Sequence, residues 1–222
     1  MAPPIVVTIE STARRTFATA ADWPGWSRSG KTEADAVAAL AAAADRYAEI
    51  AAAAGIPFPS PDARAYEVVE RAEGGAGTDF GVPSRVTDLE RRPVDAAWAA
   101  RSADLLVAAW AAFEAISSAA PESLRKGPRG GGRDTSKIVA HVAESDQAYA
   151  RELGVRVKPF EAGDRASLGS LRALMLAVLR RPSDGSPLAD RKWPHRHAAN
   201  YITWHALDHA WEILDRSRPG EG

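Results

Sequence analysis

The chain has 222 residues, a formal net charge of −1 and 45% hydrophobic residues, which suits one large or two small globular domains. This charge gives no overall basic field for nucleic acid or an anionic membrane surface, so we expect neither as a partner. The chain contains no cysteine, which excludes disulfides, thiolate metal ligands and a cysteine nucleophile.

The N-terminal sequence, Met1-Ala-Pro-Pro-Ile-Val-Val, has neither the basic nor the long apolar segment of a secretory signal. The alanine-rich stretches of the chain are interrupted by Asp, Arg and Glu, so none forms the run of about 18 apolar residues that a membrane span needs. These features predict a cytoplasmic protein.

The first part of the chain reads as a small domain of strands and one helix. We expect strands at Ile5–Glu10, Arg15–Ala21, Trp26–Arg28 and Tyr66–Arg71. Thr32 can cap a helix whose apolar residues recur at spacings of three and four until Gly55 ends it. This pattern predicts a β-β-β-α-β domain over residues 1–73, followed by a Gly- and Pro-bearing linker over residues 74–92.

The second part of the chain, residues 93–218, shows the helical period throughout. The predicted helices cover the region of Trp98–Ile116, Thr135–Gly154, the residues between Asp164 and Pro182, and His197–Arg216. Four amphipathic helices of this length close most simply into a bundle, so the predicted fold class is α+β.

Three histidines fall on the apolar sides of these predicted helices. His205 and His209 are four residues apart, so their rings project from one side of the last helix. His141 lies between Ile138 and Ser145 on the buried side of the second helix. One divalent ion would satisfy all three imidazoles, and three protein ligands leave positions open, as in catalytic zinc sites. The spacing alone is equally compatible with core histidines hydrogen-bonded to backbone or carboxylate groups.

Two segments resemble the metal-binding helices of the DinB/YfiT-like superfamily. They are Ser136-Lys-Ile-Val-Ala-His-Val-Ala-Glu-Ser-Asp and Tyr201-Ile-Thr-Trp-His-Ala-Leu-Asp-His-Ala-Trp-Glu. The resemblance covers about residues 93–216 and implies that His141, His205 and His209 are metal ligands. It also implies a four-helix bundle, and some members of the superfamily are transferases or isomerases that use mycothiol or bacillithiol.

The resemblance favours a metal-dependent transferase that uses a low-molecular-weight thiol such as mycothiol and acts on a small-molecule substrate. Zinc or nickel suits the imidazole ligands best. Glu212 and Asp208 are the candidate catalytic bases, although Glu212 is also placed for an ion pair with Arg216 and Asp208 for a solvent-exposed position. The alternatives are a metal-dependent hydrolase and a non-catalytic protein-binding module with a structural metal. His195 and His197 precede the last predicted helix, and we do not expect them to be ligands.

The segment Gly25-Trp-Ser-Arg-Ser-Gly-Lys31-Thr32 matches the phosphate-loop pattern. A phosphate-loop enzyme needs an apolar buried strand before the loop, and the preceding strand is polar, so we do not expect nucleotide binding. Residues 4–72 are instead similar to HicB-like domains through an Asp-x-Pro-Gly turn and a Gly-x-Thr helix start. We expect this domain to cover one side of the bundle or to support a homodimer.

The stretch Arg125-Lys-Gly-Pro-Arg-Gly-Gly-Gly-Arg133 is basic and rich in glycine. Its composition is typical of a solvated loop between the first two helices of the bundle. The alternative is a contact with an anionic substrate or thiol cofactor at the mouth of the bundle.

Overall fold

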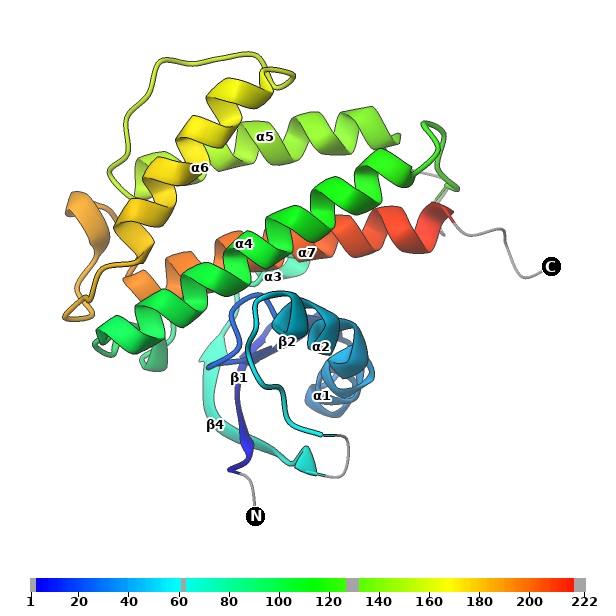
Figure 1. The fold of residues 1–222 in the computed structure, drawn as a ribbon. Coiled ribbons are helices and arrows are strands. Elements are labelled where there is room, and N and C mark those ends of the chain that lie inside the picture. Colours follow the sequence, from blue (N-terminus) through cyan, green and yellow to red (C-terminus); the bar gives the residue numbers. More distant parts are fainter. Residues whose placement is uncertain (1–2, 61–62, 127–131, 218–222) are drawn as a thin grey trace.

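The computed structural model describes residues 3–60, 63–126 and 132–217. A four-stranded sheet forms near the N-terminus and is followed by several helices, so the α+β class is confirmed (Figure 1). Within these described ranges, no helix is long and apolar enough to cross a membrane. Residues 127–131 of the basic, glycine-rich stretch lie outside the described residues.

The sheet has the strand order β3-β2-β1-β4. Its strands are β1 (Ile5–Ser11), β2 (Thr16–Ala20), β3 (Ser27–Gly30) and β4 (Tyr66–Glu73). The first three strands pair antiparallel, and β4 pairs parallel to β1 after the helical crossover. Because side chains alternate along a strand, Val7 and Ile9 of β1 enter the apolar core while Glu10 faces the other side of the sheet.

The helix predicted from Thr32 to Gly55 is instead two helices, α1 (Glu33–Ala42) and α2 (Ala44–Ala53). Thr32 caps α1 as expected, through a capping box with Asp35. The chain bends at Ala43 because the two halves of the segment pack on different partners. The first helix covers β2 and β3, whereas the second reaches the long helix α4 (Ala96–Ala119).

The residues of the phosphate-loop match have other structural roles. Ser27–Gly30 forms the edge strand β3, and the Trp26 indole is buried and donates to the Leu40 carbonyl oxygen at 3.0 Å. Gly25 has a φ of +89° and lies so close to α7 (His195–Ser217) that an added Cβ would be 2.6 Å from Thr203. The segment therefore forms a turn and a strand rather than an open phosphate-binding loop.

We accordingly expect the Lys31→Ala variant to retain the stability of the parent protein to within about 0.5 kcal/mol, because Lys31 is exposed and outside any ion pair in the described ranges. ATP or GTP with Mg²⁺ should leave the melting temperature of the parent protein unchanged. A nucleotide-induced increase in melting temperature that requires both Mg²⁺ and Lys31 would contradict this expectation.

Four long helices make up the second part of the fold: α4, α5 (Thr135–Glu152), α6 (Arg165–Leu179) and α7. Helix α7 packs against α4 and α5, and α6 packs against the other side of the same two helices. Helices α4 and α7 lie next to the sheet domain, with α5 and α6 beyond them (Figure 1). One continuous cluster of buried apolar side chains extends from β1 through α1 and α2 into all four helices, so the two parts share a core.

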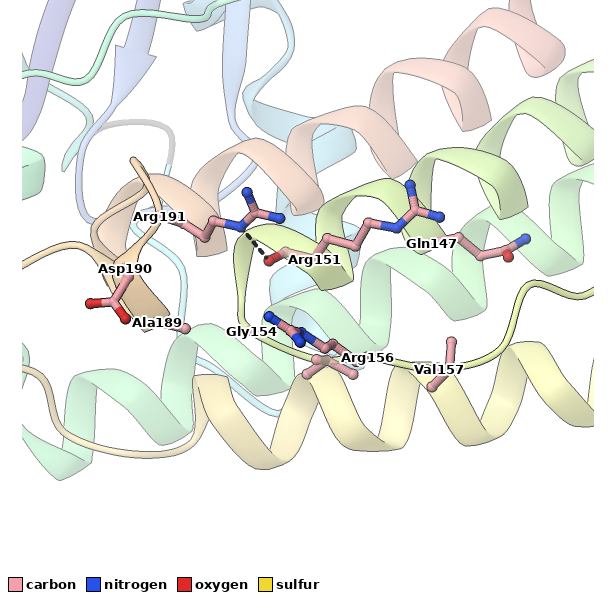
Figure 2. A pocket seen from close by; sticks show the side chains of 9 residues that line it. Gln147, Arg151, Gly154, Arg156, Val157, Ala189, Asp190 and Arg191 are labelled. Atoms are coloured by element: carbon pink, nitrogen blue, oxygen red, sulfur yellow. Dashed lines mark hydrogen bonds between the residues drawn. The ribbon is translucent and has the colours of Figure 1, made fainter.

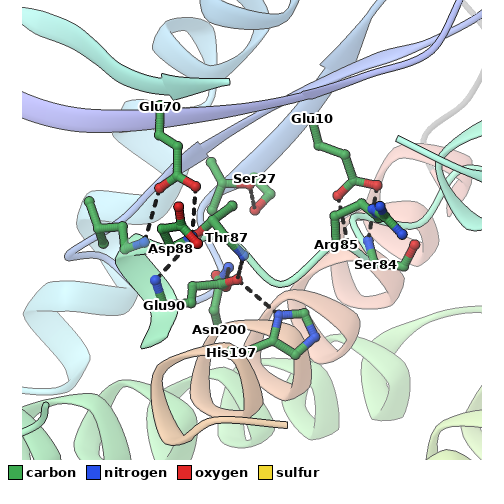
Figure 3. A network of polar contacts seen from close by, with 12 residues as sticks. Glu10, Ser27, Glu70, Ser84, Arg85, Thr87, Asp88, Glu90, His197 and Asn200 are labelled. Atoms are coloured by element: carbon green, nitrogen blue, oxygen red, sulfur yellow. Dashed lines mark hydrogen bonds and ion pairs between the residues drawn. The ribbon is translucent and has the colours of Figure 1, made fainter. Parts of the chain in front are cut away.

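The segment 74–92, expected as a linker, joins the sheet to the bundle and contains α3 (Ala76–Phe80) and the short 3-10 helix η2 (Leu89–Arg91). Carboxylates of the sheet hold this segment in place (Figure 3). Glu10 of β1 accepts backbone hydrogen bonds from Ser84 and Arg85, and Glu70 of β4 accepts them from Asp88 and Leu89. Because the segment is fixed at several points, the position of α3 relative to the bundle is fixed as well.

Glu90 connects the same segment to α7. Its carboxylate accepts hydrogen bonds from His197 Nδ1 at 3.0 Å, Asn200 Nδ2 at 3.3 Å and the Thr87 backbone amide at 3.0 Å (Figure 3). Desolvation raises the pKa of Glu90, but His197 and the other donors outweigh it and lower the pKa overall. Asn200 also accepts from the Gly25 amide at 2.9 Å, so one polar network ties sheet, segment and helix together.

Candidate metal centre

The three predicted histidines come together between α5 and α7. The four-residue spacing places the His205 and His209 rings on one side of α7, with ring centroids 4.6 Å apart. His141 extends from α5 toward them, and its ring centroid lies 5.1 Å from that of His205 and 5.0 Å from that of His209. Among the residues that the structure describes, this is the one cluster of metal-ligating side chains.

The ring nitrogens are spaced closely enough to share an ion. His141 Nε2 and His205 Nε2 are 3.3 Å apart, and one ligand nitrogen from each of the three rings lies within 4.8 Å of the others. Nitrogens bonded to tetrahedral zinc at roughly 2.0–2.1 Å are about 3.3–3.4 Å apart. The His141–His205 pair thus already has this spacing, and a modest inward movement of His209 would complete it.

The surroundings keep two of these imidazoles neutral. Burial lowers the pKa of His205 to about 2, with smaller contributions from His209, His141 and Arg133. Burial and Arg133 also lower the pKa of His141. A neutral imidazole has a free nitrogen lone pair, so both rings are in the form that binds a metal at physiological pH.

Glu212 orients the third imidazole. Its Oε2 accepts from His209 Nδ1 at 2.9 Å, and its Oε1 accepts from Arg216 Nη1 at 2.8 Å. The hydrogen bond from His209, together with Arg216, lowers the pKa of Glu212 despite partial burial. With Nδ1 donating to a carboxylate, Nε2 is the nitrogen of His209 that remains free to bind a metal, as in carboxylate–histidine–zinc arrangements.

This arrangement predicts that Glu212→Gln lowers metal affinity by about 10- to 100-fold, because the amide would orient His209 less firmly and donate less electron density to it. Competition with a metallochromic chelator measures the change. Glu161→Gln is the matched control, since Glu161 is exposed between α5 and α6 and does not line the histidine cavity. Equal affinities of the two variants would contradict the orienting role.

Asp208 directly precedes His209 in the sequence, whereas Glu212 follows it. Arg28 of β3 approaches its carboxylate at 3.5 Å, and the Arg28 guanidinium stacks on the Trp211 ring at 4.1 Å. Neighbouring groups desolvate Asp208 enough to raise its pKa, although 46% of its side-chain surface remains accessible. This residue is therefore accessible to a small molecule, whereas both carboxylate oxygens of Glu212 already accept hydrogen bonds.

A cavity of about 520 Å³ opens onto the cluster. Its lining includes all three histidines, Asp208 and Glu212, and on its rim the segment 74–92 contributes Phe80 and Val82. Arg133, two residues before α5, and Trp204 of α7 complete the wall. Sequence reasoning connects neither Phe80 nor Arg28 with the histidines, because nothing in their local spacing does so. It offers Arg133 only as the end of the basic stretch, for which contact with an anionic substrate is the alternative to a solvated loop.

His195 and His197 belong to the first turn of α7, not to a loop before it. His195 Nε2 lies 2.8 Å from the Leu179 carbonyl oxygen, and His197 donates to Glu90. Both are buried outside the cluster. They have structural partners, in agreement with their exclusion as ligands.

A larger concavity of about 650 Å³ lies at the other end of α5, away from the histidines (Figure 2). Three arginines line it, Arg151, Arg156 and Arg191, and Arg191 Nε donates to the Arg151 carbonyl oxygen at 3.2 Å. No metal-binding cluster of the described residues is there. The candidate metal ligands and the candidate bases therefore lie at the smaller cavity, the one that contains the three histidines.

Comparisons of this chain with protein-family models, with curated proteins and with solved structures gave no match.

Proposed function

We propose that this protein is a metal-dependent enzyme that transfers a group to a low-molecular-weight thiol. The observation that carries the proposal is the cluster of three imidazoles at an open cavity, without a fourth protein side chain among the described metal-ligating candidates. Catalytic zinc sites have three protein ligands and an open position, whereas structural sites are closed by four. The resemblance of the two histidine-bearing segments to DinB/YfiT-like helices supports the same assignment.

The chain's own residues have distinct roles in this proposal. His141, His205 and His209 hold one divalent ion, with zinc or nickel preferred, and Glu212 orients His209. A bound divalent ion would supply Lewis acidity, which makes a thiol more acidic at neutral pH. Val82 and Trp204 form an apolar wall on one side of the cavity.

Asp208 is the proposed proton acceptor. It borders the cavity, remains accessible and has a raised pKa, which makes its carboxylate a stronger base than an ordinary one. In the transfer step the thiol proton passes to Asp208 and the sulfur forms a bond to the electrophilic carbon. The leaving group departs with the electron pair of the bond that breaks. Because the chain contains no cysteine, the thiol comes from the cosubstrate.

The sheet domain is proposed to be HicB-like, and the order of its strands and helices supports this. Its role in the proposed enzyme is to support the cavity wall. The sheet carries Glu10 and Glu70, which fix segment 74–92, and Arg28, which contacts Asp208. We also propose that this domain supports a homodimer. Sedimentation velocity tests whether the protein is a monomer or a dimer.

The test is conjugation of a chromogenic aryl chloride with mycothiol, bacillithiol or glutathione. We expect turnover with at least one thiol, only in the metal-loaded protein, and its loss in His141→Ala with the helical circular dichroism retained. If no thiol supports turnover and none changes the visible spectrum of the cobalt-substituted protein, the transferase assignment fails. Ester hydrolysis by the metal-loaded protein without a thiol would then assign it to the hydrolases.

A further inference from the structure

We infer that the substrate of this site is a carboxylate with an apolar body, whose charged group lies beside Arg133 and whose apolar body lies against Phe80. This inference rests on the proposed function, since it names the class of molecule that shares the cavity with the ion. Three independent features of the cavity support it: an unpaired cation, the balance of charges around it, and an exposed aromatic ring at its rim.

Arg133 is the unpaired cation. The guanidinium lines the cavity, and no ion pair to it is present within residues 3–60, 63–126 and 132–217. Its backbone is fixed, because its carbonyl oxygen accepts from Arg216 Nη1 at 3.0 Å, and Arg216 is paired in turn with Glu212. Its charge acts on the cluster, since it contributes to the lowered pKa of both His141 and His205.

The acidic groups of the cavity do not neutralise Arg133. Asp208 pairs with Arg28, and Glu212 pairs with Arg216, so each carboxylate already has its own cation. The imidazoles add no negative charge, and a divalent ion would add two positive charges. An incoming anion is therefore attracted, and an incoming cation is repelled. The planar guanidinium fork suits the two oxygens of a carboxylate in particular.

The rim of the cavity offers an apolar surface to the body of the substrate. Phe80 is 85% exposed at the end of α3, where Gly81 adopts a φ of +111° and turns the chain so that Val82 also borders the cavity. Trp204 provides a further apolar wall. A substrate with an apolar body would cover the Phe80 ring, which water otherwise surrounds.

The experiment titrates cobalt-loaded protein with phenylacetate, acetate and 2-phenylethanol and follows the visible absorption spectrum. We expect phenylacetate to bind, acetate to bind about tenfold more weakly, and the uncharged alcohol to leave the spectrum unchanged. Arg133→Gln should weaken phenylacetate binding about tenfold, and Phe80→Ala should weaken phenylacetate but not acetate. Arg156→Gln is the matched control, because Arg156 is an exposed arginine at the other concavity.

Equal affinities of the alcohol and the carboxylate, or an unchanged affinity in Arg133→Gln, would overturn the inference while leaving the metal site intact. If cobalt does not bind at all, the proposed function fails instead. Calorimetry of phenylacetate binding to the metal-free protein then decides the inference separately. If phenylacetate binds the metal-free protein and Arg133→Gln weakens that binding, the inferred substrate class stands. If phenylacetate does not bind in this way, the inferred substrate class is wrong.

Discussion

Replacing His205 by alanine should abolish stoichiometric metal binding while the fold persists. The ring lies beside both other imidazoles, with its centroid 5.1 Å from that of His141 and 4.6 Å from that of His209. Losing a group that only orients a ligand already lowers affinity by about 10- to 100-fold, so losing a ligand should exceed about 100-fold. The fold should persist because the apolar core around α7 does not depend on the imidazole.

Metal content after dialysis against a buffered excess of zinc measures this effect, and far-ultraviolet circular dichroism reports the fold. The matched control is His195→Gln. This residue lies ten positions earlier on the same helix, about 15 Å away along the axis, and bonds only to a backbone carbonyl through its ring. One ion per chain should remain in that variant. An unchanged zinc content in His205→Ala would show that the ion, if bound, is held elsewhere.

The largest stability effect should come from Arg172, at a distance from the metal centre. Arg172 of α6 donates to Asp146 of α5 at 2.8 Å and to Glu114 of α4 at 2.5 Å, and its guanidinium lies 4.7 Å from the centroid of the Trp110 ring. Asp146 has 2% of its side-chain surface exposed. Arg172→Met would leave this carboxylate buried without its cation, which costs about 3–5 kcal/mol in free energy of unfolding at pH 7.

The pH dependence of that loss follows from the Asp146 carboxyl group. Burial raises the pKa of Asp146 to about 6 even with Arg172 present, above its unfolded value, so protonation favours the folded state. Removing Arg172 raises this pKa further. The stability difference between Arg172→Met and the parent protein should therefore be greatest at pH 7–8 and shrink as the pH falls through 6 toward 4.

Urea unfolding at several pH values measures both effects. The matched control is Arg180→Met, which removes a surface pair with Asp104 in which both side chains are 44% exposed and which should cost less than about 1 kcal/mol. Equal losses in the two variants, or a loss from Arg172→Met that does not change between pH 8 and pH 5, would contradict the buried-pair interpretation.

Local periodicity predicts much of this fold. The strand-forming run Ile5–Glu10 locates β1, and the three- and four-residue spacings of the later segments locate the long helices, because those spacings reflect one buried face. The same reasoning brings His205 and His209 to one side of α7. It fails at Ala43, where the bend depends on packing against both the sheet and α4, which no local pattern encodes.

The remainder of the site depends on contacts between residues far apart in sequence. Glu90 and His197 are 107 positions apart, and Arg28 and Asp208 are 180 apart, so neither pair leaves a signature in the spacing. Phe80 belongs to the segment 74–92, which the carboxylates of Glu10 and Glu70 fix on the sheet and which borders the cavity. Sequence reasoning thus reaches the three histidines and the carboxylates next to them on α7, but not Phe80, Arg28 or the long-range contacts around the site.

The most direct test of the metal centre is the structure of the zinc-loaded protein, supported by X-ray absorption at the zinc edge. We predict one zinc ion per chain, bound by His141, His205 and His209, with at least one coordination position open to the cavity that Phe80 and Arg133 border. Zinc absent from these three residues after reconstitution would contradict the metal centre itself. A fourth protein ligand that closes the site would contradict its catalytic role.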